Sequence, residues 1–151
     1  SRRYVPMDFL HSDTICSNKL QILPHANMYH FGVLTSNVHM AWMRAVCGRL
    51  KSDYDYSAKI VYNNFPWPTP TDAQKAKIEQ TAQAILDARA LYPDCSLADL
   101  YDEVTMPPEL RKAHQANDKA VMQAYGFWGK LNSESACVAE LMKLYQELTK
   151  G

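Results

Sequence analysis

Apolar and polar residues alternate near the start of the chain and then change to a helical spacing that continues to its end. The alternation covers residues 2–10, where Pro6 confines a strand to a sheet edge, and residues 19–23 form a second strand-like run. Residues 12–14 are expected to form a turn or a helix start, and residues 29–33 to be extended. Two strands are marginal alone, so we expect the chain to begin part-way through a larger sheet.

A helix that is apolar on nearly every side is predicted to start at Thr35-Ser36 and to stop at Gly48, which readily adopts a left-handed conformation. Such a helix is buried on several sides. Its only charge is Arg44, for which we expect a structural salt bridge, because an unpaired buried charge is costly. The apolar positions are Val38, Trp42, Ala45 and Val46 on one face and Met40, Met43 and Cys47 on another.

Capping residues and prolines predict the remaining helices. A Thr71–Gln74 capping box opens a long helix that reaches about Tyr92, and Ser96 with Asp99 opens a short one. Paired prolines suit the first turn of a third helix, and a serine caps the last. These two helices are expected from Pro107-Pro108 to Tyr125 and from Ser133 onward.

Alternating prolines around Trp67 exclude a regular helix or a central strand and mark a boundary. We therefore predict a mainly α fold, a C-terminal helical domain of about four to five helices preceded by a few short β-strands. The expected segments are residues 1–34, with the strands; 35–70, with the buried helix, a basic-aromatic loop and the Pro-Trp-Pro linker; and 71–151, the helical domain.

Composition excludes several classes of protein. With 47% apolar and 21% charged residues, the chain is globular rather than disordered. No run approaches the roughly 20 apolar residues that cross a bilayer. The first residues lack the apolar core of a secretory signal. These features predict a cytoplasmic protein without a membrane partner.

The net charge of zero conceals an uneven distribution. Residues 1–60 carry seven basic and four acidic side chains, whereas residues 61–151 carry nine basic and twelve acidic ones. The first part therefore has a small positive excess, which permits a polyanionic partner without arguing strongly for one.

No residue pattern indicates catalysis or a metal centre. The four cysteines are far apart and are expected to be reduced, with zinc binding a remote alternative. Asn64-Phe65-Pro66 departs from the Asn-Pro-Pro-aromatic order of amino-methyltransferases. His114 and Asp118 are four residues apart without a nearby nucleophile, so we expect a surface or capping contact. The sequence predicts no catalytic, cofactor-binding or metal-binding residue in this chain.

The basic-aromatic loop that follows the buried helix is the one candidate binding element. Arginine and lysine bind phosphates, and tyrosine stacks on bases or donates to a phosphate. A solvated surface loop whose tyrosines pack on the helix explains the same residues, and composition alone favours it. The residues concerned are Arg49, Lys51, Tyr54, Tyr56 and Lys59, with Asp53 and Asp55 between them.

The string YHFGVLTSNVHMAWMRAVCGRLKSDYDYSAKIVYNNFPWP, residues 29–68, closely resembles a signature of large bacterial class I DNA methyltransferases, the MmeI-like (type IIL) restriction–modification proteins. ILDARALYP, LADLYDEVTMPPELRKAH and the AYG of residues 124–126 resemble the C-terminal helical segment of that family. RRYVPMDFL resembles the tail of its target-recognition domain. The resemblance covers nearly the whole chain.

The resemblance implies a protein that methylates adenine N6 in double-stranded DNA with S-adenosylmethionine. In that family an upstream methyltransferase domain of the same chain holds both the cofactor and the catalytic motif. These 151 residues would then end a target-recognition domain, add the helical C-terminal domain, and hold DNA without methylating it. The candidate DNA contacts are Arg44, Arg49, Lys51, Ser52, Tyr54, Tyr56 and Lys59.

A non-catalytic helical module that binds other proteins is the alternative function. Tryptophans are common anchors of protein interfaces. Trp42, Trp67 and Trp128 would serve that role.

Overall fold

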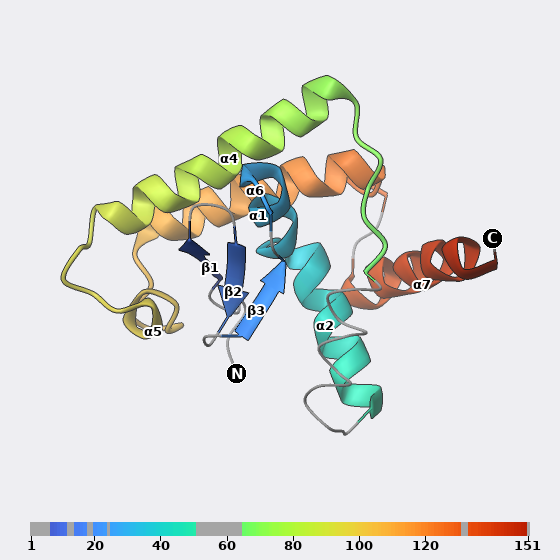
Figure 1. Ribbon diagram of the computed structural model, residues 1–151, viewed down its shortest axis with the longest axis horizontal. Helices are drawn as coiled ribbons and strands as arrows, with labels where there is room; N and C mark the ends of the chain where they lie inside the picture. The colour runs from blue at the N-terminus through green and yellow to red at the C-terminus, as the bar shows by residue number, and fades with distance from the viewer. Residues whose placement is uncertain are drawn as a thin grey trace.

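The computed structural model describes residues 7–11, 14–17, 20–23, 25–50, 65–130 and 133–150. Within these ranges a small sheet precedes six helices, which confirms the mainly helical fold (Figure 1). None of the described helices is long and apolar enough to cross a membrane. The elements are β1 (Asp8–His11), β2 (Thr14–Ser17), β3 (Leu20–Leu23), α1 (Met28–Leu34), α2 (Asn37–Leu50), α4 (Asp72–Ala90), α5 (Leu97–Leu100), α6 (Pro108–Tyr125) and α7 (Glu134–Lys150).

The strands form an antiparallel sheet in the order β1-β2-β3, with a register shift in each pair. The prediction of two strands missed β2, because Thr14 was assigned to a turn or a helix start. Ile15 is fully buried, and the ring of Phe9 stacks on Phe31 of α1 with centroids 5.5 Å apart. The sheet therefore packs its apolar side chains against the helical part of the molecule.

Residues 29–33 form most of helix α1, so the prediction of an extended segment is wrong. The side chain of Asn27 accepts a hydrogen bond from the His30 amide at 3.3 Å, and His30 Nδ1 accepts one from the Asn27 amide at 3.1 Å. This reciprocal cap starts the helix. Alternating apolar residues suggest a strand, but a short helix buried on several sides shows the same pattern.

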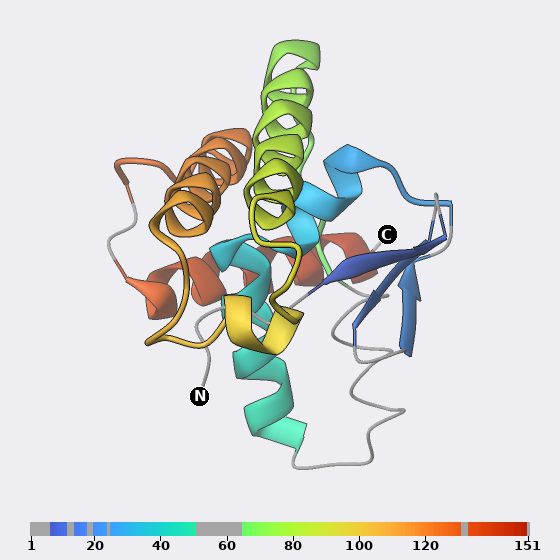
Figure 2. The ribbon, with the colours of Figure 1, turned by 90° about the vertical axis from the view of Figure 1, so that its left-hand side faces the viewer.

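Helices α4 and α6 run side by side in opposite directions, and α1 packs against both (Figures 1 and 2). The contact is close at Gly32, where a Cβ atom would lie 2.6 Å from Ile78 Cγ2 of α4. Asn117 of α6 donates to the Gly32 carbonyl at 2.8 Å and accepts from the Thr81 hydroxyl at 2.9 Å. Buried polar groups are thus satisfied where the three helices meet.

Helix α2 continues through Gly48 to Leu50, so the predicted stop at that glycine is wrong. A glycine inside a helix costs only about 1 kcal/mol relative to alanine. The first turns of α2 are held by buried Val38, Met40 and Trp42, which offset such a cost. Helix α7 packs on α2 and carries buried Leu141 into the same apolar cluster as Trp42.

The predicted starts of the later helices are confirmed. The Thr71–Gln74 and Ser96–Asp99 capping boxes are present, and Gly126 ends α6 in a left-handed conformation with φ of 79°. The Ser133 hydroxyl accepts from the Ala136 amide at 3.1 Å at the start of α7. Local capping chemistry identified these boundaries from the sequence.

His114 and Asp118 are buried, so of the two predicted alternatives the surface contact is wrong, whereas Asp118 does make a capping contact, with the Asn37 amide at the start of α2. His114 Nε2 lies 2.6 Å from the hydroxyl of Tyr101, which also accepts from buried Arg89 at 2.7 Å. Burial raises the pKa of Tyr101, against the opposing effect of the Arg89 charge. The side chains link α4, the end of α5 and α6 through one buried polar network.

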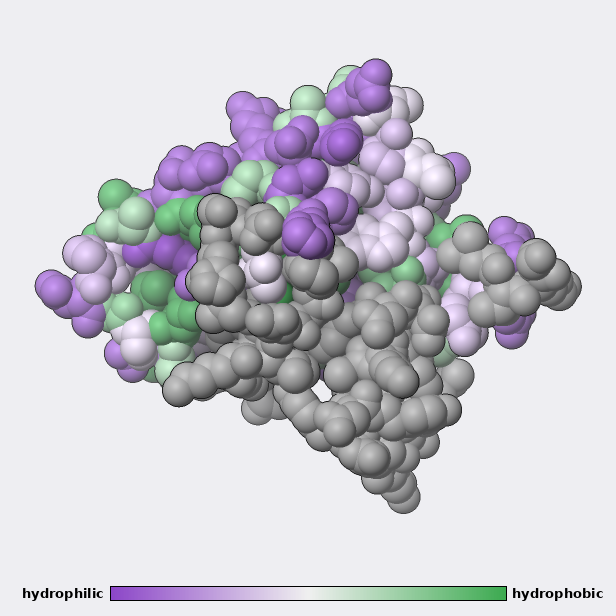
Figure 3. Space-filling model, in the orientation of Figure 1, coloured by the Kyte–Doolittle hydropathy of each residue, from purple (hydrophilic) through white to green (hydrophobic). Residues whose placement is uncertain are grey.

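Hydrophilic residues cover the edge formed by α4, and hydrophobic surface gathers near the α4–α5 end (Figure 3). Leu91 and Val104, which flank α5, are 63% and 90% exposed. Scattered exposed apolar residues are normal on globular proteins.

Candidate nucleic-acid interface

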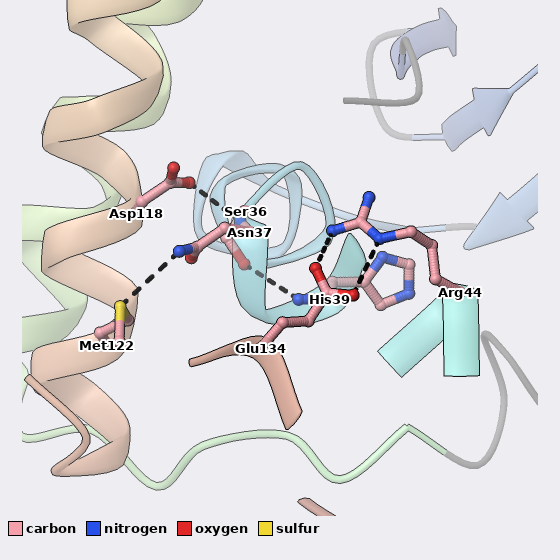
Figure 4. A network of polar contacts seen from close by, with 7 residues as sticks. All are labelled: Ser36, Asn37, His39, Arg44, Asp118, Met122 and Glu134. Atoms are coloured by element: carbon pink, nitrogen blue, oxygen red, sulfur yellow. Dashed lines mark hydrogen bonds and ion pairs between the residues drawn. The ribbon is translucent and has the colours of Figure 1, made fainter. Parts of the chain in front are cut away.

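The start of α2 is anchored by polar contacts from α6 and from the preceding turn (Figure 4). A carboxylate oxygen of Asp118 accepts from the Asn37 amide at 2.9 Å, and the Asn37 side chain donates to Met122 Sδ at 3.7 Å. The Ser36 hydroxyl donates to the Val33 carbonyl at 2.7 Å. A negative charge at a helix N-terminus complements the helix dipole, so Asp118 fixes where α2 begins.

Aromatic side chains hold the middle of α2 against the residues that follow the predicted loop. Trp42 lies between Phe65 and Tyr145, with centroid distances of 6.0 and 5.8 Å. Phe65 also meets the edge of buried His39 at 4.8 Å, and the Tyr125 hydroxyl donates to the Pro66 carbonyl at 2.6 Å. The chain thus leaves α2 at residue 50 and re-enters the described core at Phe65, which is buried.

Arg44 forms the salt bridge that its place on an apolar helix predicts. Its Nη2 lies 2.6 Å from Glu134 Oε1, and its Nε donates to Oε2 at 3.2 Å (Figure 4). The two side chains are 40% and 53% exposed, so water screens the pair. An open groove of about 610 Å³ between α2 and α7 adjoins it. Any anion that Arg44 binds would compete with Glu134.

The other predicted DNA contacts lie at or beyond the end of α2. The backbone of Arg49 belongs to the last turn of that helix. The side chain of Arg49 and all of Lys51, Ser52, Tyr54, Tyr56 and Lys59 lie outside the described residues. Their contacts with DNA stay a prediction. The structure describes the helix that precedes these residues, α2.

The anchors Asp118, Phe65 and Tyr125 were not predicted as functional residues. A buried carboxylate that caps a distant helix leaves no local pattern, because Asn37 and Asp118 are 81 residues apart in sequence. The tryptophans of the alternative function differ in exposure: Trp42 is 1% exposed and belongs to the core, whereas Trp128 is 50% exposed beneath Lys119. Trp42 is therefore excluded as a docking anchor.

Metal and thiol chemistry has little support in the described part of the chain. There, no three His, Cys, Asp or Glu side chains are grouped closely enough to hold a metal ion. Cys95 is exposed and Cys137 is buried, and both are free thiols. Burial raises the pKa of the Cys137 thiol, which keeps it protonated.

Replacing Arg44 by Gln is expected to lower the free energy of unfolding by less than about 1 kcal/mol, because an exposed ion pair contributes little. Glu134→Gln removes the same pair but leaves the positive charge free to bind an anion. Urea unfolding of the two variants measures the stability effect. A loss above about 3 kcal/mol, the size expected for a broken buried pair, would contradict the screened geometry.

Alkaline pH is expected to destabilise the protein. Burial raises the pKa of Tyr29 to about 12 and the pKa of Tyr125 well above its ordinary value. The folded state therefore retains these protons where the unfolded state, with tyrosine pKa values near 10, loses them. This stabilisation is complete below about pH 10 and is lost as the pH rises toward 12. Unfolding in urea from pH 8 to 11 should show the decline, less steeply in Tyr125→Phe; a free energy independent of pH would contradict it.

Two protein-family models together match the whole chain. The family model for the MmeI target recognition domain matches residues 1–69, and the model for the MmeI C-terminal domain matches residues 70–151. The chain belongs to the MmeI family. The resemblance inferred from residues 29–68 is thereby confirmed, and with it the association with DNA methyltransferases and restriction–modification proteins.

Two relatives match along nearly the entire chain. DNA methyltransferase A of Bacillus subtilis (strain 168) is 42% identical over 150 residues, which are 99% of this chain and 17% of that protein. The type IIL restriction–modification enzyme MmeI, solved in complex with DNA, is 45% identical with a TM-score of 0.81 over 99% of this chain and 20% of the enzyme. The chain thus spans about a fifth of the length of these relatives.

The two MmeI family models meet between residues 69 and 70, inside the proline-rich linker. Packing crosses this boundary, because Gly32 of α1 touches Ile78 of α4 and α2 packs on α7. The end of the recognition domain and the C-terminal helices therefore share one core.

Proposed function

We propose that this chain is the DNA-holding end of a longer restriction–modification methyltransferase, comprising the last part of the target-recognition domain and the C-terminal helical domain. The observation that carries the proposal is the match of both MmeI family models in succession over the whole chain. The relative of known structure was solved with DNA bound. At 45% identity and a TM-score of 0.81, its fold is shared by this chain.

The anchored helix α2 supports a DNA-facing role for the residues after it. Its first turn is fixed by Asp118, its middle by Trp42, and the returning chain by Phe65. An anchored helix holds the start of the segment that follows it in a fixed place, and binding residues are often found next to such rigid elements. Arg49 lies in the last turn of α2, and Lys51 and Lys59 follow within a short stretch of sequence.

We further propose that the whole protein methylates adenine N6 with S-adenosylmethionine held by a domain outside these 151 residues. The described strands form an antiparallel sheet, whereas nucleotide-type cofactors bind at the ends of parallel strands next to glycine-rich turns. This difference supports placing the cofactor in another domain of the whole protein. The role of this chain is to bind and orient DNA beside a catalytic domain elsewhere.

A gel-shift titration of the chain with random duplex DNA tests the proposal. At low salt the duplex should be retarded, and added salt should weaken the complex because lysine and arginine displace counterions from phosphates. Absence of retardation at any salt concentration would contradict DNA holding by this chain. It would instead favour a protein-binding module, for which exposed Trp128 and half-buried Trp67 are the candidate anchors.

A further inference from the structure

An aromatic groove lies where α1, the proline-rich linker and α4 meet. It encloses about 440 Å³ and is lined by Tyr29, His30, Trp67, Pro68, Pro70 and Lys75. The Trp67 ring stands 5.4 Å from His30, nearly perpendicular to it, and 6.3 Å from Tyr29. The volume falls within the range of ligand-binding clefts. These six residues come from both sides of the boundary between the two family models.

The polar side chains that line the aromatic groove carry hydrogen-bond donors. Lys75 supplies an ammonium, which lies 5.6 Å from the centroid of the Tyr29 ring. His30 Nδ1 accepts from the Asn27 amide, so the neutral imidazole carries its hydrogen on Nε2. Burial, with the Lys75 charge second, lowers the pKa of His30 and favours that neutral form. No carboxylate is among the six lining side chains, so the complementary ligand is anionic and rich in acceptors.

A duplex presents its sugar–phosphate backbone outward while its bases stay stacked inside. Most protein–DNA hydrogen bonds are made to that backbone. A phosphate oxygen complements Lys75 and His30, and the apolar face of a deoxyribose complements the rings of Trp67 and the neighbouring prolines. An open groove can admit such a unit without opening the base pairs.

We propose that the aromatic groove binds one sugar–phosphate unit of duplex DNA, with the phosphate on Lys75 and His30 and the deoxyribose against Trp67. This inference rests on the proposed DNA binding and adds a contact remote in sequence from the candidate contacts at residues 49–59. The DNA would then touch the segments matched by both family models: the linker and α4 as well as residues 49–59.

Lys75→Gln tests the contact, and Lys77→Gln is the matched control, because Lys77 is an exposed lysine on the same helix that does not line the groove. Equilibrium binding of the full chain to a duplex is measured from about 50 to 300 mM salt. Over this range the slope of log K against log salt reports the number of phosphates that the protein neutralises. Lys75→Gln should bind about five- to tenfold more weakly and lower the slope of log K against log salt by about 1. Lys77→Gln should keep the wild-type slope.

Trp67→Leu removes the aromatic wall without changing charge, so it should weaken binding while leaving the salt slope unchanged. Thermal unfolding of each variant confirms that the fold is retained. Equal affinities and slopes for Lys75→Gln and Lys77→Gln would overturn the groove contact while leaving DNA binding intact. A wild-type chain that binds no duplex would overturn the proposed function itself.

Discussion

Gly32→Ala is expected to destabilise the protein by about 1–2 kcal/mol, since inserting a methyl group into a packed core typically costs about 1–3 kcal/mol. The added Cβ would lie 2.6 Å from Ile78 Cγ2, 3.0 Å from Asn117 Oδ1 and 3.2 Å from Ala82 Cβ. Ile78 is fully buried and its methyl group is attached to a branched carbon, so it cannot rotate away freely. Alanine favours helix over glycine by about 1 kcal/mol, which opposes the clash without cancelling it.

A double-mutant cycle isolates the cause of this loss. Ile78→Leu removes the branched methyl group that the new Cβ would strike, so the double variant should lose less stability than the sum of the two single losses. Urea unfolding of the four proteins gives the coupling energy. Additive losses would show that Gly32 is not held against α4 as the structure describes.

Replacing Arg49, Lys51 and Lys59 together by Gln is expected to lower the affinity for duplex DNA by about two orders of magnitude at low salt. If each side chain neutralises one phosphate, the slope of log K against log salt should fall by about 3. The thermal unfolding midpoint, measured in parallel, confirms that each variant is folded.

The matched control neutralises three exposed lysines on the α4 and α6 surface, Lys77, Lys112 and Lys119. This control removes the same charge from residues outside the proposed interface. It should lose far less affinity than the variant at positions 49, 51 and 59. Equal losses would mean that the affinity for DNA depends on net charge alone, and the proposed contact of residues 49–59 would be wrong.

Elements with local start signals were predictable from the sequence. Helices α4, α5 and α6 begin at capping residues or prolines whose effect depends on neighbours within a few positions. Such interactions are visible in sequence because both partners lie within one turn. The salt bridge of Arg44 was predicted, but not for the right reason, since the side chain is 40% exposed rather than buried, and its partner Glu134 was not predictable.

The errors concern residues whose structure depends on distant contacts. Residues 29–33 alternate as a strand would, yet they form a helix in which Gly32 lies close to Ile78 and Asn117. Gly48 ends no helix, and His114 is buried by Tyr101 rather than exposed. Single-sequence reasoning cannot foresee these tertiary partners. The aromatic groove was missed for the same reason, because its six residues come from three separate segments.

Crosslinking from position 54 tests the central claim, that the residues after α2 face DNA, most directly. Tyr54→p-benzoylphenylalanine should give a covalent adduct with duplex DNA upon illumination. Tyr92→p-benzoylphenylalanine, placed just beyond the end of α4 where the native Tyr92 hydroxyl donates to Glu109, should give none. An adduct from position 92 with none from position 54 would contradict the account, because DNA would then contact the α4–α5 end of the molecule.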